Sequence, residues 1–216
     1  MPESHTARDE ILGRIRRSIA SDDEAEPKRE WSAIQRPFHR KGTLSAEQRI
    51  ALFSDRLHDY GAGVYECSRE HLKTVISDVL RQRGKKTIII RPAWPEDLIP
   101  IGIEAIRDKD LSYDALDQSE GIMTACTVAI ALTGTIVLRG GPLEGRRALT
   151  LIPDYHLCLV ETGQIVELVP EGIERLRAFS TAPLTFISGP SATADIEMMR
   201  VQGVHGPRTL DVVIVT

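Results

Sequence analysis

The stretch G-V-Y-E-C-S-R-E-H-L-K-T-V-I-S-D-V-L-R-Q-R-G-K-K-T-I-I-I-R, residues 63–91, decides the fold class. Its first part, Gly63–Cys67, has the composition of a short strand, and Ser68–Arg83 has the apolar spacing of a helix that ends at Gly84. Lys86–Arg91 is a short apolar run of the kind found in buried strands. A strand, a helix and a second strand over this length are typical of a right-handed crossover between parallel strands. The stretch therefore predicts a parallel sheet.

Helical and strand patterns alternate along most of the remaining chain. Ser45–Tyr60 has a helical pattern, with Ser45 and Gln48 as the two residues of a capping box. Further helices are predicted around 100–107, around 126–132 within the segment 121–134, and over 170–179. Further strands are predicted at 135–139, 148–152, 155–161, 164–169, 184–188 and 211–215. This alternation predicts an α/β protein with a Rossmann-like, mostly parallel sheet.

The N-terminal residues differ in character from the rest. Ala7–Ala20 places Ile11 and Ile15 at helical spacing among charged residues, which predicts an amphipathic helix. The charged run S-D-D-E-A-E-P-K-R-E that follows has little to bury and is typical of a linker. We therefore expect residues 1–42 to form a helical arm, which docks on its own domain or on a partner, and residues 43–216 to form the compact α/β domain.

Composition narrows the class of protein. The chain has 216 residues, 42% of them hydrophobic, and a formal net charge of −4, whereas a nucleic-acid partner favours a basic chain. No apolar run approaches the roughly 20 residues of a membrane helix. The first ten residues lack the order of a signal peptide, so we expect a cytoplasmic protein without a membrane span.

The cysteines, Cys67, Cys126 and Cys158, are three in number and far apart. No C-x-x-C pair occurs, which argues against a disulfide framework or a zinc ribbon. An iron–sulfur cluster usually needs four thiolates, so we expect the chain to carry no cluster of its own. The pair His156 and Cys158 shares one face of a predicted strand, but a metal site there needs further ligands. Neither a metal nor a cofactor is predicted.

Two motifs in the middle of the chain gather groups that hold anions. Thr133, Gly134 and Thr135 place two hydroxyl groups beside a glycine, between a predicted helix and a strand. The alternative is that Gly134 only ends the helix. The loop R-G-G-P-L-E-G-R-R that follows contains Arg146 and Arg147, whose guanidinium groups suit carboxylates and phosphates. It either closes over an anionic ligand or forms a solvated hairpin turn.

The C-terminal segment F-I-S-G-P-S-A-T-A-D-I-E holds a third motif, residues 186–197. Gly189 ends a predicted strand, and the proline after it suits the first position of a helix. The amides at the start of such a helix, with the hydroxyl groups of Ser191 and Thr193, predict an anion site. Asp195 falls in the predicted first turn, where it contributes to the site or only caps the turn.

Shortly afterwards, G-V-H-G-P-R brings His205 and Arg208 into one compact loop. A histidine titrates near neutrality, so His205 is a candidate acid or base, and Arg208 a candidate anion ligand. The alternative is that His205 only hydrogen-bonds the loop to the domain. The chain has no G-x-S-x-G, P-loop or G-x-G-x-x-G, so the familiar hydrolase and nucleotide signatures are absent.

Four motifs in this order resemble the lactate utilization protein C family, whose shared module is the LUD domain: A-I-A-L-T-G-T-I-V-L at 129–138, L-I-P-D-Y-H at 151–156, S-G-P-S-A-T-A-D-I-E at 188–197 and G-V-H-G-P-R at 203–208. The N-terminal helix, with I-L-x-R-I, also fits, so the resemblance covers nearly the whole chain. It implies a domain like those of ribose-5-phosphate isomerase, glucosamine-6-phosphate deaminase and the CoA transferases. It also implies work with two iron–sulfur proteins that oxidise L-lactate to pyruvate.

This resemblance makes the chain a candidate subunit of an iron–sulfur-dependent L-lactate oxidation system, itself without a cluster. The alternative is a stand-alone enzyme or a sensor for a small anionic metabolite, a phosphosugar or an acyl-CoA. In that alternative, His205 is the catalytic acid or base and Thr135, Ser191 and Thr193 are the anchors. Leu132 stands where the family usually has an acidic residue, which favours binding over catalysis.

Overall fold

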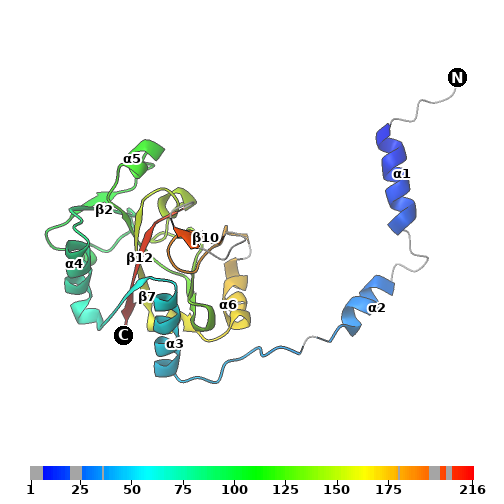
Figure 1. Cartoon of the computed structure of the whole chain (residues 1–216), viewed down its shortest axis with the longest axis horizontal. Coiled ribbons are helices and arrows are strands. Elements are labelled where there is room, and N and C mark those ends of the chain that lie inside the picture. The colour runs from blue at the N-terminus through cyan, green and yellow to red at the C-terminus, as the bar shows by residue number, and fades with distance from the viewer. Residues whose placement is uncertain (1–6, 20–25, 36, 180, 195–199, 203–205) are drawn as a thin grey trace. The chain divides into compact units, whose positions relative to one another are not determined.

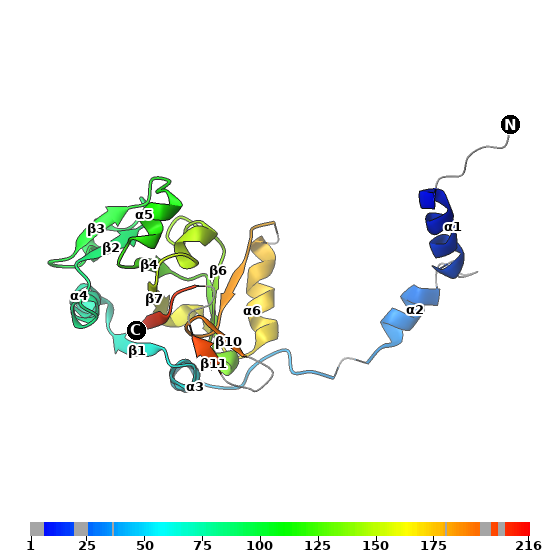
Figure 2. The same ribbon diagram turned by 45° about the horizontal axis from the view of Figure 1, so that its top comes forward.

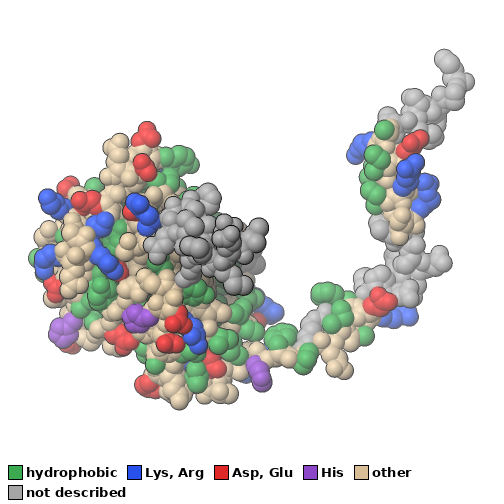
Figure 3. Space-filling view, in the orientation of Figure 1, with side chains coloured by type: hydrophobic (Ala, Val, Ile, Leu, Met, Phe, Trp, Pro, Cys, Tyr) green, Lys and Arg blue, Asp and Glu red, His purple; other side chains and the backbone are tan. Residues whose placement is uncertain are grey.

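The computed structural model describes residues 7–19, 26–35, 37–179, 181–194, 200–202 and 206–216. The chain divides into two compact units, Met1–Phe38 and His39–Thr216. The first unit contains α1 (Ala7–Ile19) and α2 (Glu26–Ala33). The amphipathic helix predicted there is confirmed: Ile11 and Ile15 are exposed, and hydrophobic side chains gather along one side of α1 (Figure 3). No described helix in either unit is long and apolar enough to cross a membrane.

The second unit is built on a six-stranded, all-parallel sheet with the order β1-β12-β7-β4-β2-β3 (Figure 1). Its strands are β1 (Gly63–Cys67), β2 (Thr87–Ile90), β3 (Glu104–Arg107), β4 (Ile122–Ala125), β7 (Tyr155–Glu161) and β12 (Thr209–Val215). The predicted α/β class and parallel sheet are confirmed. The strands β1 and β2 that the opening stretch predicts are both present, but three other strands lie between them.

Both faces of this sheet are buried, because successive side chains of its central strands point to opposite sides. Tyr155, Leu157 and Leu159 pack on the side of α4 (Leu72–Gln82). Cys158 and Val160 pack on the side of α3 (Ala46–Asp59) and of a second sheet. A strand that is buried on both faces consists of nearly continuous apolar residues, as in Y-H-L-C-L-V-E of β7.

The helix α3 begins as the sequence predicts. Ser45 accepts a hydrogen bond from the amide of Gln48, and the Gln48 side chain accepts one from the amide of Ser45, which confirms the capping box. A short 3-10 turn, η1 (Arg69–His71), precedes α4. On another flank, α5 (Tyr113–Asp117) packs Leu116 against Leu149 (Figure 2).

The second sheet has four strands in the order β8-β5-β6-β9. Its members are β5 (Val128–Ile130), β6 (Thr135–Leu138), β8 (Ile165–Val166) and β9 (Thr185–Ile187). One face packs against α3 and the main sheet, and the other against Leu176 of α6 (Val169–Leu176), which a 3-10 turn η6 (Arg177–Phe179) extends. The domain is therefore layered: α4, main sheet, α3 with the second sheet, then α6 (Figure 1).

Four predicted elements are wrong. The helix predicted at 100–107 is the edge strand β3, and the helix predicted within 121–134 is β4, β5 and the 3-10 turn η3 (Ala131–Thr133). The strand predicted at 148–152 is the 3-10 turn η4 (Arg147–Thr150). The helix predicted after Gly189 is a hairpin of β10 (Ala192–Ala194) and β11 (Arg200–Gln202). The remaining short turns are η2 (Glu96–Leu98) and η5 (Thr162–Gln164).

One buried carboxylate joins the end of α4 to the main sheet through hydrogen bonds. Asp211 of β12, 0% exposed, accepts hydrogen bonds from Arg83 Nε at 2.8 Å and Arg83 Nη2 at 2.6 Å, after the end of α4. It also accepts one from the Tyr155 hydroxyl of β7 at 2.9 Å. Burial, and then the Asp211 charge, raise the pKa of Tyr155, so this hydroxyl keeps its proton and stays a donor.

We expect Arg83→Leu to lower the free energy of unfolding by about 3 kcal/mol, because a fully buried carboxylate then loses its cation. Chemical denaturation at pH 7 measures the change. Arg81→Leu is the matched control: Arg81 lies in the last turn of α4 and pairs with Asp78 at the surface, where a pair contributes about 0–1 kcal/mol. Equal losses in the two variants would contradict the role given to Asp211.

Candidate functional site

A cavity of about 300 Å³ lies beside the Ser188–Ser191 turn, which the sequence singles out. It is small, near the lower end of the range for ligand pockets. Polar groups reach it from several elements: Arg147 and Thr150 from η4, His156 from β7, and Ser188 and Ser191 from the turn after β9. Gly206 and Pro207 close another side. The site therefore joins segments that are far apart in sequence.

Backbone geometry around Gly189 shapes this turn. Gly189 has φ +82°, and a Cβ atom there would lie 2.4 Å from Tyr60 Cβ, so any larger residue would collide with the end of α3. The amide of Ser191 donates to the carbonyl of Pro207 at 2.8 Å. Since β10 follows in place of a helix, the unpaired helix-start amides of the predicted anion site do not form. Side chains, rather than helix amides, supply the polar groups of this cavity.

A row of hydroxyl groups connects two of the predicted motifs. Thr133 Oγ1 and Thr135 Oγ1 are 2.8 Å apart, and Thr135 Oγ1 and Ser188 Oγ are 2.8 Å apart. Pairing of β6 with β9 produces this contact, since Ile136 lies opposite Ile187. Gly134 ends η3 in the left-handed conformation, so the alternative reading of the T-G-T motif as a helix end is confirmed for a 3-10 turn. Of these three hydroxyl residues, Ser188 lines the cavity.

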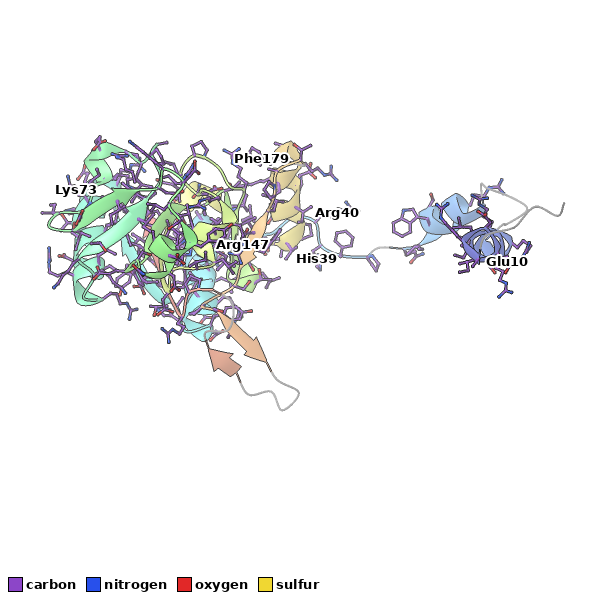
Figure 4. All side chains as sticks on the ribbon, turned by 90° about the horizontal axis from the view of Figure 1, so that it is seen from above. Glu10, His39, Arg40, Lys73, Arg147 and Phe179 are labelled. Carbon is purple, nitrogen blue, oxygen red and sulfur yellow. The ribbon has the colours of Figure 1, made fainter. Side chains whose placement is uncertain are left out.

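The cation at the cavity is Arg147. Its Nη1 donates to Thr150 Oγ1 at 3.0 Å, which uses one of the five N–H donors of the guanidinium and directs the side chain. Figure 4 labels Arg147 within the domain. Its neighbour Arg146 has a different role, because it donates to both carboxylate oxygens of buried Asp108, at 3.1 and 3.4 Å. Of the two arginines that the loop predicts as anion ligands, Arg147 is the one at the cavity.

Beside it, His156 is buried and its Nε2 lies 2.7 Å from Thr124 Oγ1. Burial, and then the Arg147 charge, lower the pKa of His156 to about 4. The ring is therefore neutral at pH 7, and it presents a polar but uncharged surface to the cavity. Cys158 lies 3.7 Å from the same threonine oxygen, so the His156–Cys158 pair belongs to the core. Within the described residues, no three His, Cys, Asp or Glu side chains converge as a metal ion would require.

The other predicted site residues are placed differently. Arg208 is engaged by Asp154, to which its Nε and Nη2 donate at 2.6 and 2.8 Å, and it does not line the cavity. Of Thr193 the structure describes the backbone, within β10. Asp195 and His205 lie outside the described residues. Sequence reasoning missed Thr150, His156 and Ser188 as cavity residues. The signal near Thr150 was the double arginine that precedes it.

The fold agrees with comparisons to known proteins. The family model described as the LUD domain matches residues 50–215, and this chain belongs to that family. It is 40% identical to the lactate utilization protein C of Deinococcus radiodurans, over 100% of this chain and 98% of that protein. It is 25% identical to the lactate utilization protein C of Halalkalibacterium halodurans, over 92% of this chain and 90% of that one.

A solved structure supports the fold. The crystal structure of a DUF162 family protein from Deinococcus radiodurans is 36% identical and superimposes with a TM-score of 0.70, over 81% of this chain and 100% of that chain. The resemblance to the lactate utilization protein C family, which the four motifs indicated, is therefore confirmed.

The lowered pKa of His156 makes stability depend on pH. Because the pKa is about 4 in the folded state and about 6.5 in the unfolded state, the unfolded state binds more protons between these values. The contribution of His156 to the free energy of unfolding is fully present above about pH 6.5 and is lost as the pH falls toward 4. The loss is about 2 kcal/mol between pH 7 and 4.5. Urea unfolding of the native protein and of His156→Gln at several pH values measures it. A variant that loses stability on acidification as steeply as the native protein would contradict this prediction.

Proposed function

We propose that this chain serves in lactate utilization, as a cytoplasmic subunit that works with two iron–sulfur proteins in the oxidation of L-lactate to pyruvate. Its own contribution is to bind a small carboxylate in the cavity beside the Ser188–Ser191 turn. It supplies no iron–sulfur cluster. The partners would carry the electron transfer.

The single observation that carries the proposal is the extent of the likeness to the Deinococcus radiodurans lactate utilization protein C. At 40% identity the likeness spans 100% of this chain and 98% of that protein. Both the N-terminal arm and the α/β domain therefore have counterparts in that relative. This supports a shared role for the whole chain rather than for one module.

The geometry of the cavity supports a small carboxylate as the ligand. Its volume of about 300 Å³ is more than enough for a molecule as small as lactate. Arg147 offers a planar, always charged group that matches a carboxylate. Thr150 and Ser188 add hydroxyl groups, which hydrogen-bond a hydroxyl or keto oxygen. Thr135 holds the Ser188 hydroxyl, Thr133 holds Thr135 beside Gly134, and Gly189 and Ser191 also line the cavity. Arg208, Thr193, Asp195 and a catalytic role for His205 stay predictions.

We expect Arg147→Gln to weaken binding of L-lactate roughly tenfold or more, because a hydrogen bond to a charged group contributes about 1.5–3 kcal/mol. Isothermal titration calorimetry, with thermal shift at millimolar ligand, measures it. Arg208→Gln tests the competing arginine, and Arg81→Gln is the control for loss of a surface charge. Loss of binding in Arg208→Gln alone would assign the ligand to the G-V-H-G-P-R loop instead.

A second candidate function is an enzyme or sensor for another small anion. The observation that favours it is the same set of groups, since a guanidinium with hydroxyl groups also suits a phosphate. A thermal-shift comparison of L-lactate and pyruvate with sugar phosphates and CoA thioesters separates the candidates, because a ligand of the folded state raises the melting temperature. A rise in melting temperature with a sugar phosphate or a thioester, but not with lactate, would identify that compound as the ligand in place of lactate.

The arm supports the proposed assembly. Ile11 and Ile15 on one side of α1 are 58% and 50% exposed, and an amphipathic helix of this kind binds in a groove of a partner. We expect the double variant Ile11→Asp and Ile15→Asp to lose co-purification with the two iron–sulfur proteins, while the melting temperature of the α/β domain is unchanged. Arg17→Asp, on another side of the helix, changes the net charge by the same amount and is the control. Full co-purification of the double variant would contradict docking through α1.

A further inference from the structure

A second, larger cavity of about 630 Å³ lies at the other end of β7. His156 near the start of β7 lines the first cavity, whereas Leu159 and Glu161 at its end line the second. Ala125, the last residue of β4, also lines it. In α/β proteins, ligands bind outside the carboxyl ends of the parallel strands. This cavity occupies that position in the main sheet.

The inner walls of the cavity are apolar. Trp94 and Leu98, from the segment after β2, line it together with Leu159, and Leu72 at the start of α4 contributes a further apolar side chain. All four are buried in the hydrophobic cluster on the α4 side of the sheet. Such a surface binds a ring or a hydrocarbon body by removing apolar area from water. A molecule as polar as lactate would make little use of it.

Two arginines at the cavity have no carboxylate partner among the described residues. The Arg139 guanidinium stacks at 4.1 Å over the ring of Phe179, which Figure 4 labels at the end of α6. Arg175 Nη1 donates to the carbonyl of Gly163 at 2.7 Å. Neither guanidinium forms an ion pair within the described ranges, whereas Arg69, at the same cavity, pairs with Glu161.

The other acidic group at the cavity forms no ion pair with Arg139 or Arg175 among the described residues. Glu144 is buried and accepts hydrogen bonds from Thr127 Oγ1 at 2.5 Å and from the amides of Arg139 at 2.6 Å and Gly141 at 3.2 Å. These contacts fix the loop after β6 and use both oxygens of the carboxylate. Three arginines and two glutamates line the cavity, so its formal net charge is +1.

We propose that this cavity is a second ligand site, which binds an organic anion with an apolar ring body. Arg139 and Arg175 hold the acidic group, and the ring system packs against Trp94 and Leu98. The volume is about twice that of the first cavity and lies well within the range for such ligands.

The cysteine at this cavity does not make it a reactive site. Cys126 lines the cavity, and its thiol donates to Gln164 Oε1 at 3.2 Å. The neighbouring Cys158 thiol, and then burial, raise the pKa of Cys126 well above its ordinary value. The thiolate, which is the nucleophilic form, is therefore scarce at neutral pH.

The test uses two fluorescent probes and the full chain. The first probe is 8-anilinonaphthalene-1-sulfonate, an anion, and the second is N-phenyl-1-naphthylamine, which has the same ring body without the sulfonate. We expect the native protein to bind the anion more tightly than the neutral probe. The double variant Arg139→Met and Arg175→Met should weaken binding of the anion about tenfold or more and leave binding of the neutral probe nearly unchanged. The double variant Arg81→Met and Arg177→Met, at two surface arginines, is the matched control.

A second variant, Ala125→Phe, fills the cavity and should abolish binding of both probes. It keeps the proposal testable if the arginine variants fail to fold, and thermal unfolding checks the fold of each. L-Lactate at saturating concentration should displace neither probe, which separates this site from the first cavity. Equal binding of the two probes by the native protein, or anion binding that survives in both the arginine variant and Ala125→Phe, would overturn the proposal.

Discussion

The fold depends on the hydrogen bonds that Asp211 receives near the start of β12 in the main sheet. A carboxylate that is fully buried is stable only with a cation and further donors, and Arg83 and Tyr155 supply them. Arg83 follows α4, Tyr155 begins β7 and Asp211 lies in β12, so the contact fixes a helix against two central strands. It lies on the α4 side of the sheet, which leaves the opposite side, with His156 and Thr124, to support the smaller cavity.

Much of the fold was predictable where a local signal defines each element. The capping box at Ser45, the apolar run of β7 and the proline at the start of α6 each specify one element, and the structure has all three. The segment 121–134 was wrongly predicted to be helical. Ile122, Met123 and Thr124 are all buried, so β4 has no alternation of polar and apolar residues. Its alanines also favour helix in isolation. Tertiary burial, which the local pattern does not contain, decided in favour of strands.

The candidate site was predictable in part. The hydroxyl groups of the T-G-T motif were identified, but their contact with Ser188 follows from the pairing of β6 with β9, about which the motif carries no information. The sequence alone likewise does not show which arginine, Arg147 or Arg208, lies at the cavity. Asp154 engages Arg208, whereas Arg147 bonds to Thr150 at the cavity, and no spacing along the chain distinguishes the two. Prediction of the larger cavity requires knowledge of the strand order, because residues from the ends of β4 and β7 line it.

The position of β12 has a consequence for synthesis on the ribosome. In the order of the main sheet, β1 has β12 as its neighbour, and Gly63 lies opposite Asp211. At translation rates of about 5–20 residues per second, β1 emerges roughly 7–30 s before the strand that pairs with it. During that interval the backbone groups of β1 stay unpaired and the apolar side of α3 stays uncovered by β12. The nascent chain therefore exposes apolar surface and an unpaired strand, which favour aggregation, until β12 has been translated and has left the ribosome.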